Sequence, residues 1–275
     1  AYDWYEGHQE DSLYASSLYY MGKCFLLNDS MEQAKSCLEK SYSISDSLHN
    51  MNLICLALDK LIEVEEQLAP YKALNYAKAL VKMYESMPNV SIYNKVAARL
   101  RLCDNFMFVD SLRQALCEGQ IALKLAMKDA DRNLYSFVCQ DLANVYEKVG
   151  EKDSCLFYAR QAYSSNGTDR LSCQLMLASA YISVDSIERA FAILKQATPK
   201  TPEDRYSVFF MQSQAAMKTS NYMLAKTFGD SANSCLQNMY RSALQAKINY
   251  YTSFLKKESE RAKMQGKAEM QRWVF

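Results

Sequence analysis

The stretch Leu142-Ala-Asn-Val-Tyr146 contains the pattern that organises the whole chain. In it a small residue, Ala143, is followed by an aromatic residue three positions later and by a second small residue, Cys155, twelve positions later. The other clear copies are Leu177-Ala-Ser-Ala-Tyr181 with Ala190, Leu194 and Ala197, and Tyr20-Met-Gly-Lys-Cys-Phe25 with Ala34 and Leu38. Small residues at this separation let two antiparallel helices approach closely, so each stretch predicts a helical hairpin.

The first small residue of each copy can be taken as an anchor, which divides the chain into about six hairpins. The anchors are Gly22, Leu61, Cys103, Ala143, Ala178 and Ser213. The residues twelve positions further on are Ala34, Ala73, Ala115, Cys155, Ala190 and Ala225. A plain helical bundle with alanines placed by chance is the alternative, but chance would not keep this offset in most hairpins. We expect short turns such as Asn28-Asp-Ser30, in which Asp, Ser or Asn caps the following helix.

Composition favours an all-α fold. Glycine (7) and proline (4) are scarce among the 275 residues, so few positions interrupt a helix. Runs of alternating β-branched residues are nearly absent, which leaves no evident source of a sheet. No apolar run reaches the roughly 18 residues that indicate a membrane-spanning helix.

The repeated pattern resembles the tetratricopeptide repeat, which has Leu-Gly-x-x-Tyr on its first helix and Ala-x-x-x-Phe-x-x-Ala on its second. The anchors here are 39, 42, 40, 35 and 35 residues apart, and the later spacings are near the family period of about 34. The resemblance implies a right-handed superhelical solenoid of antiparallel helical hairpins. It is clear in the first, fourth and fifth hairpins and degenerate in the other three.

We expect two parts, a repeat array over residues 1–238 and a long C-terminal capping or extension helix over residues 239–275. Residues 1–14 are interpreted as the end of a truncated hairpin, with Trp4 and Tyr5 packing on the first repeat. In the C-terminal part, a stripe that can cover the last hairpin consists of Leu244, Ile248, Tyr251 and Leu255. The charged residues that follow predict a solvated helix, which either frays or continues towards a coiled coil or a membrane span. Because the chain starts without Met and ends at Arg272-Trp-Val-Phe275, we expect a fragment of a longer protein with a transmembrane helix after Phe275.

In the tetratricopeptide family the first helix of each hairpin lines a concave groove, so the resemblance implies partner-binding residues at fixed offsets from the anchors. These offsets give a candidate groove of Tyr19, Tyr20, Lys23, Arg101, Asp104, Gln140, Asp141, Asn144, Met176 and Met211. Flexible Met side chains suit apolar peptide or helix surfaces, although they can equally contact neighbouring helices. The family's clamp for acidic chaperone tails is not present, because Gln140 replaces its Lys and Asp104 replaces its Asn.

Charge and motifs argue against other classes of function. The 32 Lys and Arg residues balance 31 Asp and Glu residues, so no basic field favours nucleic acid. No catalytic or phosphate-binding motif occurs, and His8 and His49 are isolated. The acidic cluster Glu63, Glu65 and Glu66 is interpreted as a solvated helix face. We therefore expect no enzymatic activity, no cofactor and no metal.

None of the nine cysteines forms a C-x-x-C pair, so a zinc or thioredoxin-like site is not indicated. Most occupy apolar helix faces, where Cys packs as a small hydrophobe. If any two form a disulfide, Cys139 and Cys155 are the first pair to consider, because both belong to one hairpin.

The expected function is a protein-interaction scaffold that binds a protein or peptide along the groove. The Tyr-rich helices, Asp-Ser turns and charged terminal helix resemble the tetratricopeptide sensor regions of membrane-anchored regulators of Bacteroidetes. That resemblance implies a periplasmic location, whereas nine free thiols favour a reducing compartment. A cytoplasmic adaptor with no membrane or signalling link is the alternative.

Overall fold

The computed structural model describes residues 12–165 and 169–273 and divides into two compact units, which meet at Val184 and Asp185. In the described residues the chain is helical and contains no strand, which confirms the all-α prediction. The first unit holds α2 (Ser12–Leu27), α3 (Met31–Ser47), α4 (Met51–Leu68), α5 (Pro70–Ser86), α6 (Ile92–Phe108), α7 (Leu112–Ala126), α8 (Arg132–Val149), α9 (Lys152–Ser164) and α10 (Arg170–Ser183). The second holds α11 (Ile187–Lys195), α12 (Pro202–Lys218) and α13 (Tyr222–Trp273). Trp4, Tyr5 and most of the expected truncated hairpin lie outside the described residues, and residues 12–14 begin α2.

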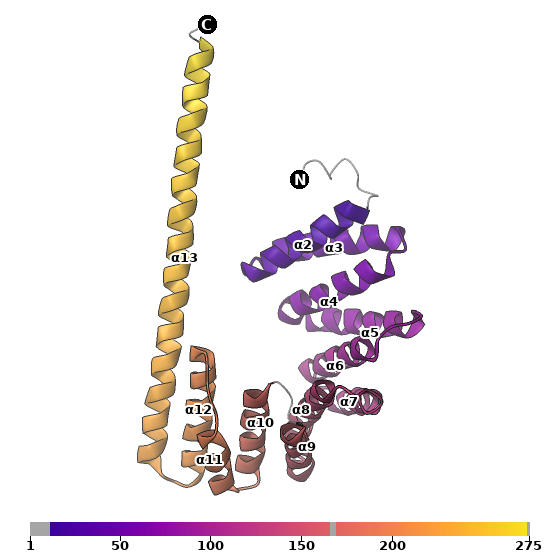
Figure 1. The fold of residues 1–275 in the computed structure, drawn as a ribbon, viewed down its shortest axis with the longest axis vertical. Helices are drawn as coiled ribbons and strands as arrows, with labels where there is room; N and C mark the ends of the chain where they lie inside the picture. The colour runs from indigo at the N-terminus through magenta and orange to yellow at the C-terminus, as the bar shows by residue number, and fades with distance from the viewer. Residues whose placement is uncertain (1–11, 166–168, 274–275) are drawn as a thin grey trace. The chain divides into compact units, whose positions relative to one another are not determined.

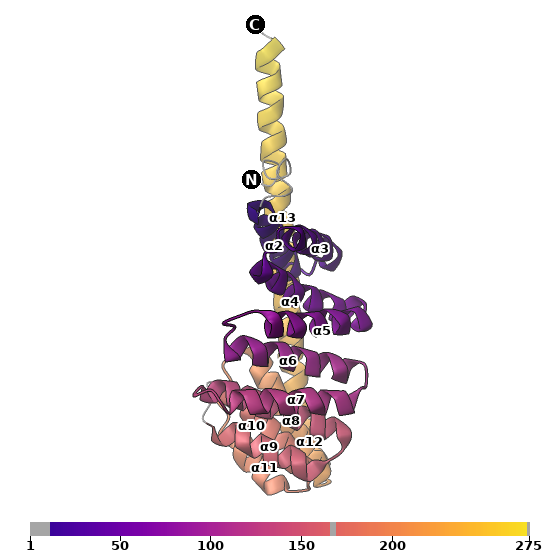
Figure 2. The ribbon, with the colours of Figure 1, turned by 90° about the vertical axis from the view of Figure 1, so that its right-hand side faces the viewer.

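The first unit is a stack of helical hairpins. Each helix from α2 to α9 packs against the next helix in the chain, so α2/α3, α4/α5, α6/α7 and α8/α9 form successive pairs (Figures 1 and 2). The first helices also contact each other across hairpins, α2 with α4, α6 with α8, and α8 with α10. This arrangement places the first helices side by side along one face of the unit, and that face carries the candidate groove.

Contacts across the hairpins confirm the twelve-residue offset. The Cys103 thiol donates a hydrogen bond to the carbonyl oxygen of Ala115, with 3.2 Å between the two atoms. In the second unit the Ser213 hydroxyl likewise donates a hydrogen bond to the carbonyl oxygen of Ala225, with 2.9 Å between the two atoms. At Gly22 an added Cβ would lie 2.6 Å from Leu38 Cγ. The anchors are therefore small because the second helix lies directly against them.

The second hairpin departs from this register. Its anchor was placed at Leu61, twelve residues before Ala73, but Ile62 is the residue that shares a core cluster with Ala73. Leu61 packs instead in the cluster of the preceding hairpin. The reason is the turn, because only Ala69 separates α4 from α5, whereas three residues separate α2 from α3. With the anchor at Ile62, the family offsets fall on Asp59, Lys60, Glu63 and Glu66.

Three turns between consecutive helices use a left-handed residue rather than a side-chain cap, whereas at the turn before α13 the predicted cap is present, since Asn221 Oδ1 accepts a hydrogen bond from the backbone N–H of Leu224 at 3.1 Å. Asp29, Asp110 and Asp185 have φ of 56°, 57° and 57°. The Ser that follows each of them makes no side-chain hydrogen bond to its helix, so the predicted capping is wrong at these turns. Side-chain caps occur mostly in the loops between hairpins, at Asn50, Ser91, Asp131, Asp169 and Thr201.

In the second unit, α12 packs against the first part of α13, and α13 continues well beyond it as a single helix (Figure 1). The prediction that an apolar stripe covers the last hairpin is wrong for the residues described. Leu244, Ile248 and Leu255 are 61%, 49% and 65% exposed, because α12 has only 17 residues and cannot reach them. The Tyr251 side chain lies outside the described part. Among the described helices, none is long and apolar enough to cross a membrane.

Candidate functional site

Two neighbouring cavities on the face of the first helices form the candidate site, which we call the central site. The larger has a volume of about 450 Å³ and is lined by α4, α5 and α6. The smaller has a volume of about 190 Å³ and is lined by α4, α6 and the Lys148 side chain of α8. Arg101 and Asp104 line both cavities, so the two adjoin at these side chains.

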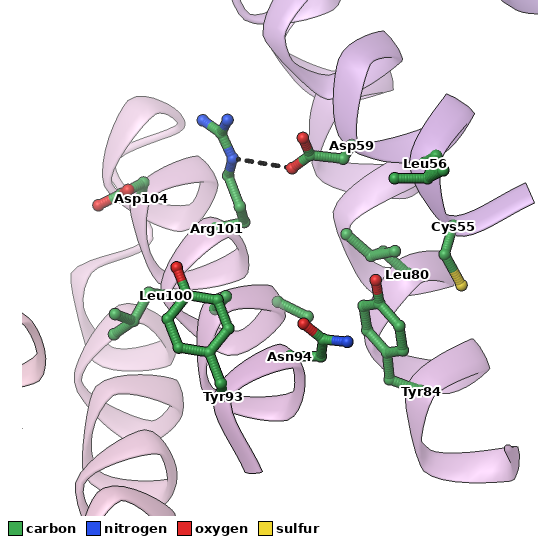
Figure 3. A pocket seen from close by; sticks show the side chains of 12 residues that line it. Cys55, Leu56, Asp59, Leu80, Tyr84, Tyr93, Asn94, Leu100, Arg101 and Asp104 are labelled. Carbon is green, nitrogen blue, oxygen red and sulfur yellow. Dashed lines mark hydrogen bonds and ion pairs between the residues drawn. The ribbon is translucent and has the colours of Figure 1, made fainter. Parts of the chain in front are cut away.

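The larger cavity combines aromatic and charged groups. Figure 3 shows Tyr93 and Tyr84 on the two sides of Asn94, with Arg101 reaching across to Asp59. Tyr93 is 55% exposed and Leu56 is 46% exposed, so apolar surface remains open at the mouth of this cavity. A cavity of this kind can accept one or two side chains of a peptide.

Arg101 is held by two carboxylates of α4. Its Nε lies 3.4 Å from Asp59 Oδ1, and its Nη1 lies 3.9 Å from Glu66 Oε1. The Asn105 side-chain amide donates a second contact to Glu66 Oε1, at 3.0 Å. Burial nevertheless raises the pKa of Glu66, and Arg101 and Asn105 only partly oppose this effect. Arg101 is thus fixed in place by α4 rather than free to bind an anion.

Asp104 of α6 and Asp141 of α8 lie on helices that contact each other, and the charge of Asp104 acts on Asp141, so we call them the carboxylate pair. Among the described residues, no hydrogen bond or ion pair to either carboxylate is present. Burial raises the pKa of Asp104 to about 6, which Arg101 and Lys148 oppose and Glu66 reinforces. Burial, followed by the charge of Asp104, raises the pKa of Asp141 well above its ordinary value. Two half-buried acids therefore share one environment without a fixed cation between them.

The structure separates the residues predicted from the repeat offsets into three groups. Arg101 and Asp104 lie in the central site, and Asp141 interacts with Asp104. Tyr19 and Gln140 are only 5% and 7% exposed, so they support the face rather than offer contact surface. The remaining members are Tyr20, Lys23, Asn144 and Met176, which are half-buried or exposed on α2, α8 and α10, and Met211, which belongs to α12 of the second unit.

The buried members make specific contacts. Lys23 Nζ lies 5.6 Å and 5.7 Å from the ring centres of Tyr19 and Tyr20. The Ser172 hydroxyl of α10 donates to Gln140 Oε1 of α8, at 2.7 Å. The first contact lies within α2 and the second connects the neighbouring first helices α8 and α10, so these predicted groove residues also have a structural role.

Sequence reasoning missed several residues of the central site, among them Asp59, Glu66, Tyr84 and Tyr93. The candidate groove included no residue of the second hairpin, and Glu66 falls on a family offset only when the anchor is Ile62. Tyr84 comes from a second helix, and Tyr93 lies in the first turn of α6, so the offsets did not reach either residue.

The interpretation of the acidic cluster on α4 as a solvated face is also wrong. Glu65 is 0% exposed and pairs with Lys35 of α3 at 2.8 Å, and Glu66 lines the smaller cavity. Of the three, Glu63 is the most exposed, and it pairs with Lys60 at 2.8 Å. The cluster therefore contributes to the packing of α3 on α4 and to the central site.

The cysteines are free thiols, and Cys139 does not lie with Cys155. Cys139 packs with Ala162 and Cys173 in one core cluster. Burial raises the pKa of Cys139 and Cys155 to about 11, so both remain protonated at neutral pH. Within the described residues no group of His, Cys, Asp and Glu side chains could hold a metal ion.

No protein-family model and no curated protein matches the sequence. Solved structures do match the fold, and they define its class as a solenoid of helical hairpins of the tetratricopeptide-like kind. BtubC from P. vanneervenii superposes with a TM-score of 0.65 at 12% identity, over 77% of this chain and 92% of that one.

Two further structures place the same fold in larger proteins. A signal transduction ATPase with a tetratricopeptide repeat sensor, from Pyrococcus horikoshii, superposes with a TM-score of 0.67 at 14% identity. The match covers 85% of this chain but only 38% of that protein. A Rap protein complexed with competence and sporulation factor superposes with a TM-score of 0.57 at 12% identity, over 82% of this chain and 75% of that one. These likenesses establish the fold.

Proposed function

We propose that this chain is a non-catalytic protein-interaction scaffold that holds a peptide segment of a partner at the central site. The observation that carries the proposal is the pair of adjoining cavities, which expose Tyr93 and Leu56 beside fixed charged groups on the face of the first helices. Aromatic surface gives contact area at low conformational cost, and fixed charges orient the bound segment.

Within that function, we propose that the chain is the sensor portion of a longer, membrane-anchored regulator, on the periplasmic side of the membrane. The resemblance of the sequence to Bacteroidetes sensor regions supports this, as does the repeat sensor of the archaeal ATPase with the similar fold. The nine free cysteines support the alternative, a cytoplasmic adaptor. A run of about 20 apolar residues after Phe275 in the full-length sequence would favour the membrane-anchored regulator.

Photo-crosslinking tests the scaffold function. Tyr93 is replaced by p-benzoylphenylalanine, and the matched control carries the same replacement at Phe157 of α9, since the two side chains are 55% and 54% exposed. In an extract of the producing cells, we expect irradiation to give a discrete protein adduct at position 93 and none at position 157. The adduct should weaken when Arg101→Ala is added. Equal labelling at the two positions, or labelling at 157 alone, would refute the proposed site.

A further inference from the structure

We infer that the partner segment is basic, and that one Lys or Arg side chain of it lies beside Asp104, where the two cavities adjoin, while a neighbouring apolar or aromatic side chain fills the larger cavity. This inference rests on the proposed function and names the chemistry of its ligand. It follows from the cavity, from the local charges and from the missing partner of the carboxylate pair.

The charge of this face differs from that of the whole chain. The chain as a whole is nearly neutral, with 32 basic and 31 acidic residues. Around the central site, the acidic side chains are Asp59, Glu63, Glu66, Asp104 and Asp141, and the basic ones are Lys60, Arg101 and Lys148. The local excess of carboxylates favours a cationic ligand.

Two of the three basic side chains named around the central site, Lys60 and Arg101, are already in ion pairs with other carboxylates. Lys60 pairs with Glu63 at 2.8 Å and with Asp59 at 3.4 Å, and Arg101 also pairs with Asp59. Of the five carboxylates named around the central site, Asp104 and Asp141 are the two without an ion pair. Because Asp104 lines both cavities, a cation placed there is reached from the larger cavity and from the smaller one.

Apolar surface beside the carboxylates further restricts the chemical class of the ligand. Leu56 and Tyr93 are about half exposed at the larger cavity, next to Asp59 and Asp104. A free metal ion or small amine would leave this surface exposed to water. A peptide with a basic residue next to an apolar or aromatic one covers the surface and neutralises the charge together.

Cation binding at the pair must depend on pH. Arg101, Glu66 and Lys148 are the other charged groups that act on Asp104, and Asp104 is the group that acts on Asp141. A cation binds the ionised form, so affinity rises as the pair loses its protons. For a carboxyl with a pKa of about 6, the ionised fraction grows about fourfold between pH 5.5 and pH 7.5.

The test begins with a phage library of random twelve-residue peptides, selected on the full chain and screened again on Tyr93→Ala. We expect peptides that need Tyr93 and carry Lys or Arg next to an apolar or aromatic residue. If no selected peptide depends on Tyr93, both the proposed site and this inference fail. If the dependent peptides are acidic or uncharged, the scaffold function stands and the basic ligand is refuted.

Fluorescence polarisation with the best peptide then tests the carboxylate pair. We expect Asp104→Asn with Asp141→Asn to weaken binding about tenfold or more, and norleucine in place of the peptide's basic residue to do the same. The matched control is Glu32→Gln with Asp153→Asn, which removes the same charge from exposed positions on α3 and α9 and should leave affinity unchanged. Affinity should rise about fourfold from pH 5.5 to pH 7.5 in the wild type and stay flat in the Asn variant. Wild-type affinity in the Asn variant would overturn the inference.

Discussion

Replacing Asp104 by Asn should stabilise this protein at neutral pH, which is the opposite of the usual effect of a change at a half-buried polar residue. The folded state raises the pKa of Asp104 from 3.8 to about 6. Because each unit of pKa is worth about 1.4 kcal/mol, the ionised carboxylate destabilises the fold by up to about 3 kcal/mol. Water still reaches the side chain, and an amide must also be solvated, so we expect a gain of about 1–2 kcal/mol.

The direction of the pKa shift of Asp104 determines how the stability of the protein depends on pH. A carboxyl with a raised pKa in the folded state keeps its proton longer there than in the unfolded chain. The stability of the wild type should therefore fall as pH rises from about 4 to about 6 and remain lower above that range. Asp104→Asn should lack this fall, so the two proteins should match near pH 4 and differ most at pH 7.5.

Urea unfolding followed by far-UV circular dichroism at pH 4.5, 6 and 7.5 measures these differences. Asp153→Asn, at an exposed position on α9, is the control and should change stability by less than about 0.5 kcal/mol. In the double variant Asp104→Asn/Asp141→Asn the gain should be smaller than the sum of the single gains, because either change alone already removes the repulsion. A loss of stability in Asp104→Asn at pH 7.5, or a gain that is the same at pH 4.5, would refute the reasoning.

Three other predictions concern packing and the thiols. Gly22→Ala should destabilise the protein by about 1–3 kcal/mol, because the added Cβ would lie 2.6 Å from Leu38 Cγ. Gly229→Ala, whose added Cβ has its nearest neighbour 3.6 Å away, should be neutral or stabilising by about 0.5–1 kcal/mol. Equal urea midpoints for the two variants would contradict this prediction. Lys35→Met should lose about 3–5 kcal/mol because it leaves the buried Glu65 carboxylate unpaired, and Lys35→Met/Glu65→Leu should recover most of it; no recovery in urea unfolding would show that the charge is not the cause. In the native protein iodoacetamide should alkylate the exposed Cys24 and Cys117 first and Cys139 last, because burial raises the pKa of Cys139 to about 11; early labelling of Cys139 by mass spectrometry would contradict this placement.

The hairpins could be predicted from the sequence because close packing leaves a local signature. A hairpin whose helices touch needs small residues at a fixed separation, and the pairs Cys103/Ala115 and Ser213/Ala225 show that separation as hydrogen bonds. Where the turn between the two helices has a different length, the number of residues between the two packed positions changes, and the residue types give no sign of this change. The one-residue turn at Ala69 moved the anchor from Leu61 to Ile62, and Pro70 was the available sign of that turn.

The central site was predictable only in part, since it depends on contacts between hairpins. The offsets identified Arg101, Asp104 and Asp141, because each lies on the first helix of a hairpin whose register was correct. They could not identify Tyr84, which reaches the larger cavity from a second helix. They also could not show that Glu65 is buried, because a pairing with Lys35 of the previous hairpin is invisible to a pattern within one helix.

The junctions between neighbouring first helices differ in a way that packing alone does not explain. Between α4 and α6, Asp59 meets Arg101 at 3.4 Å. Between α8 and α10, the Ser179 hydroxyl donates to Glu147 Oε1 at 2.6 Å, so a polar pair is again satisfied. Between α6 and α8 the charge of Asp104 instead disfavours the ionised form of Asp141, and an Asn at either position would avoid this cost.

A destabilising carboxylate, Asp104, at the point where the two cavities adjoin is the pattern expected of a binding site, where stability is lost in exchange for affinity. Asp104→Asn therefore tests the role of the carboxylate pair with two measurements, the free energy of unfolding and the capture of a basic peptide. If Asp104→Asn raises the free energy of unfolding and also weakens the capture of a basic peptide, the carboxylate pair serves the ligand rather than the fold. If it raises the free energy of unfolding and leaves capture intact, the pair has no role in binding, and Arg101 with the aromatic residues of the larger cavity must hold the partner without it.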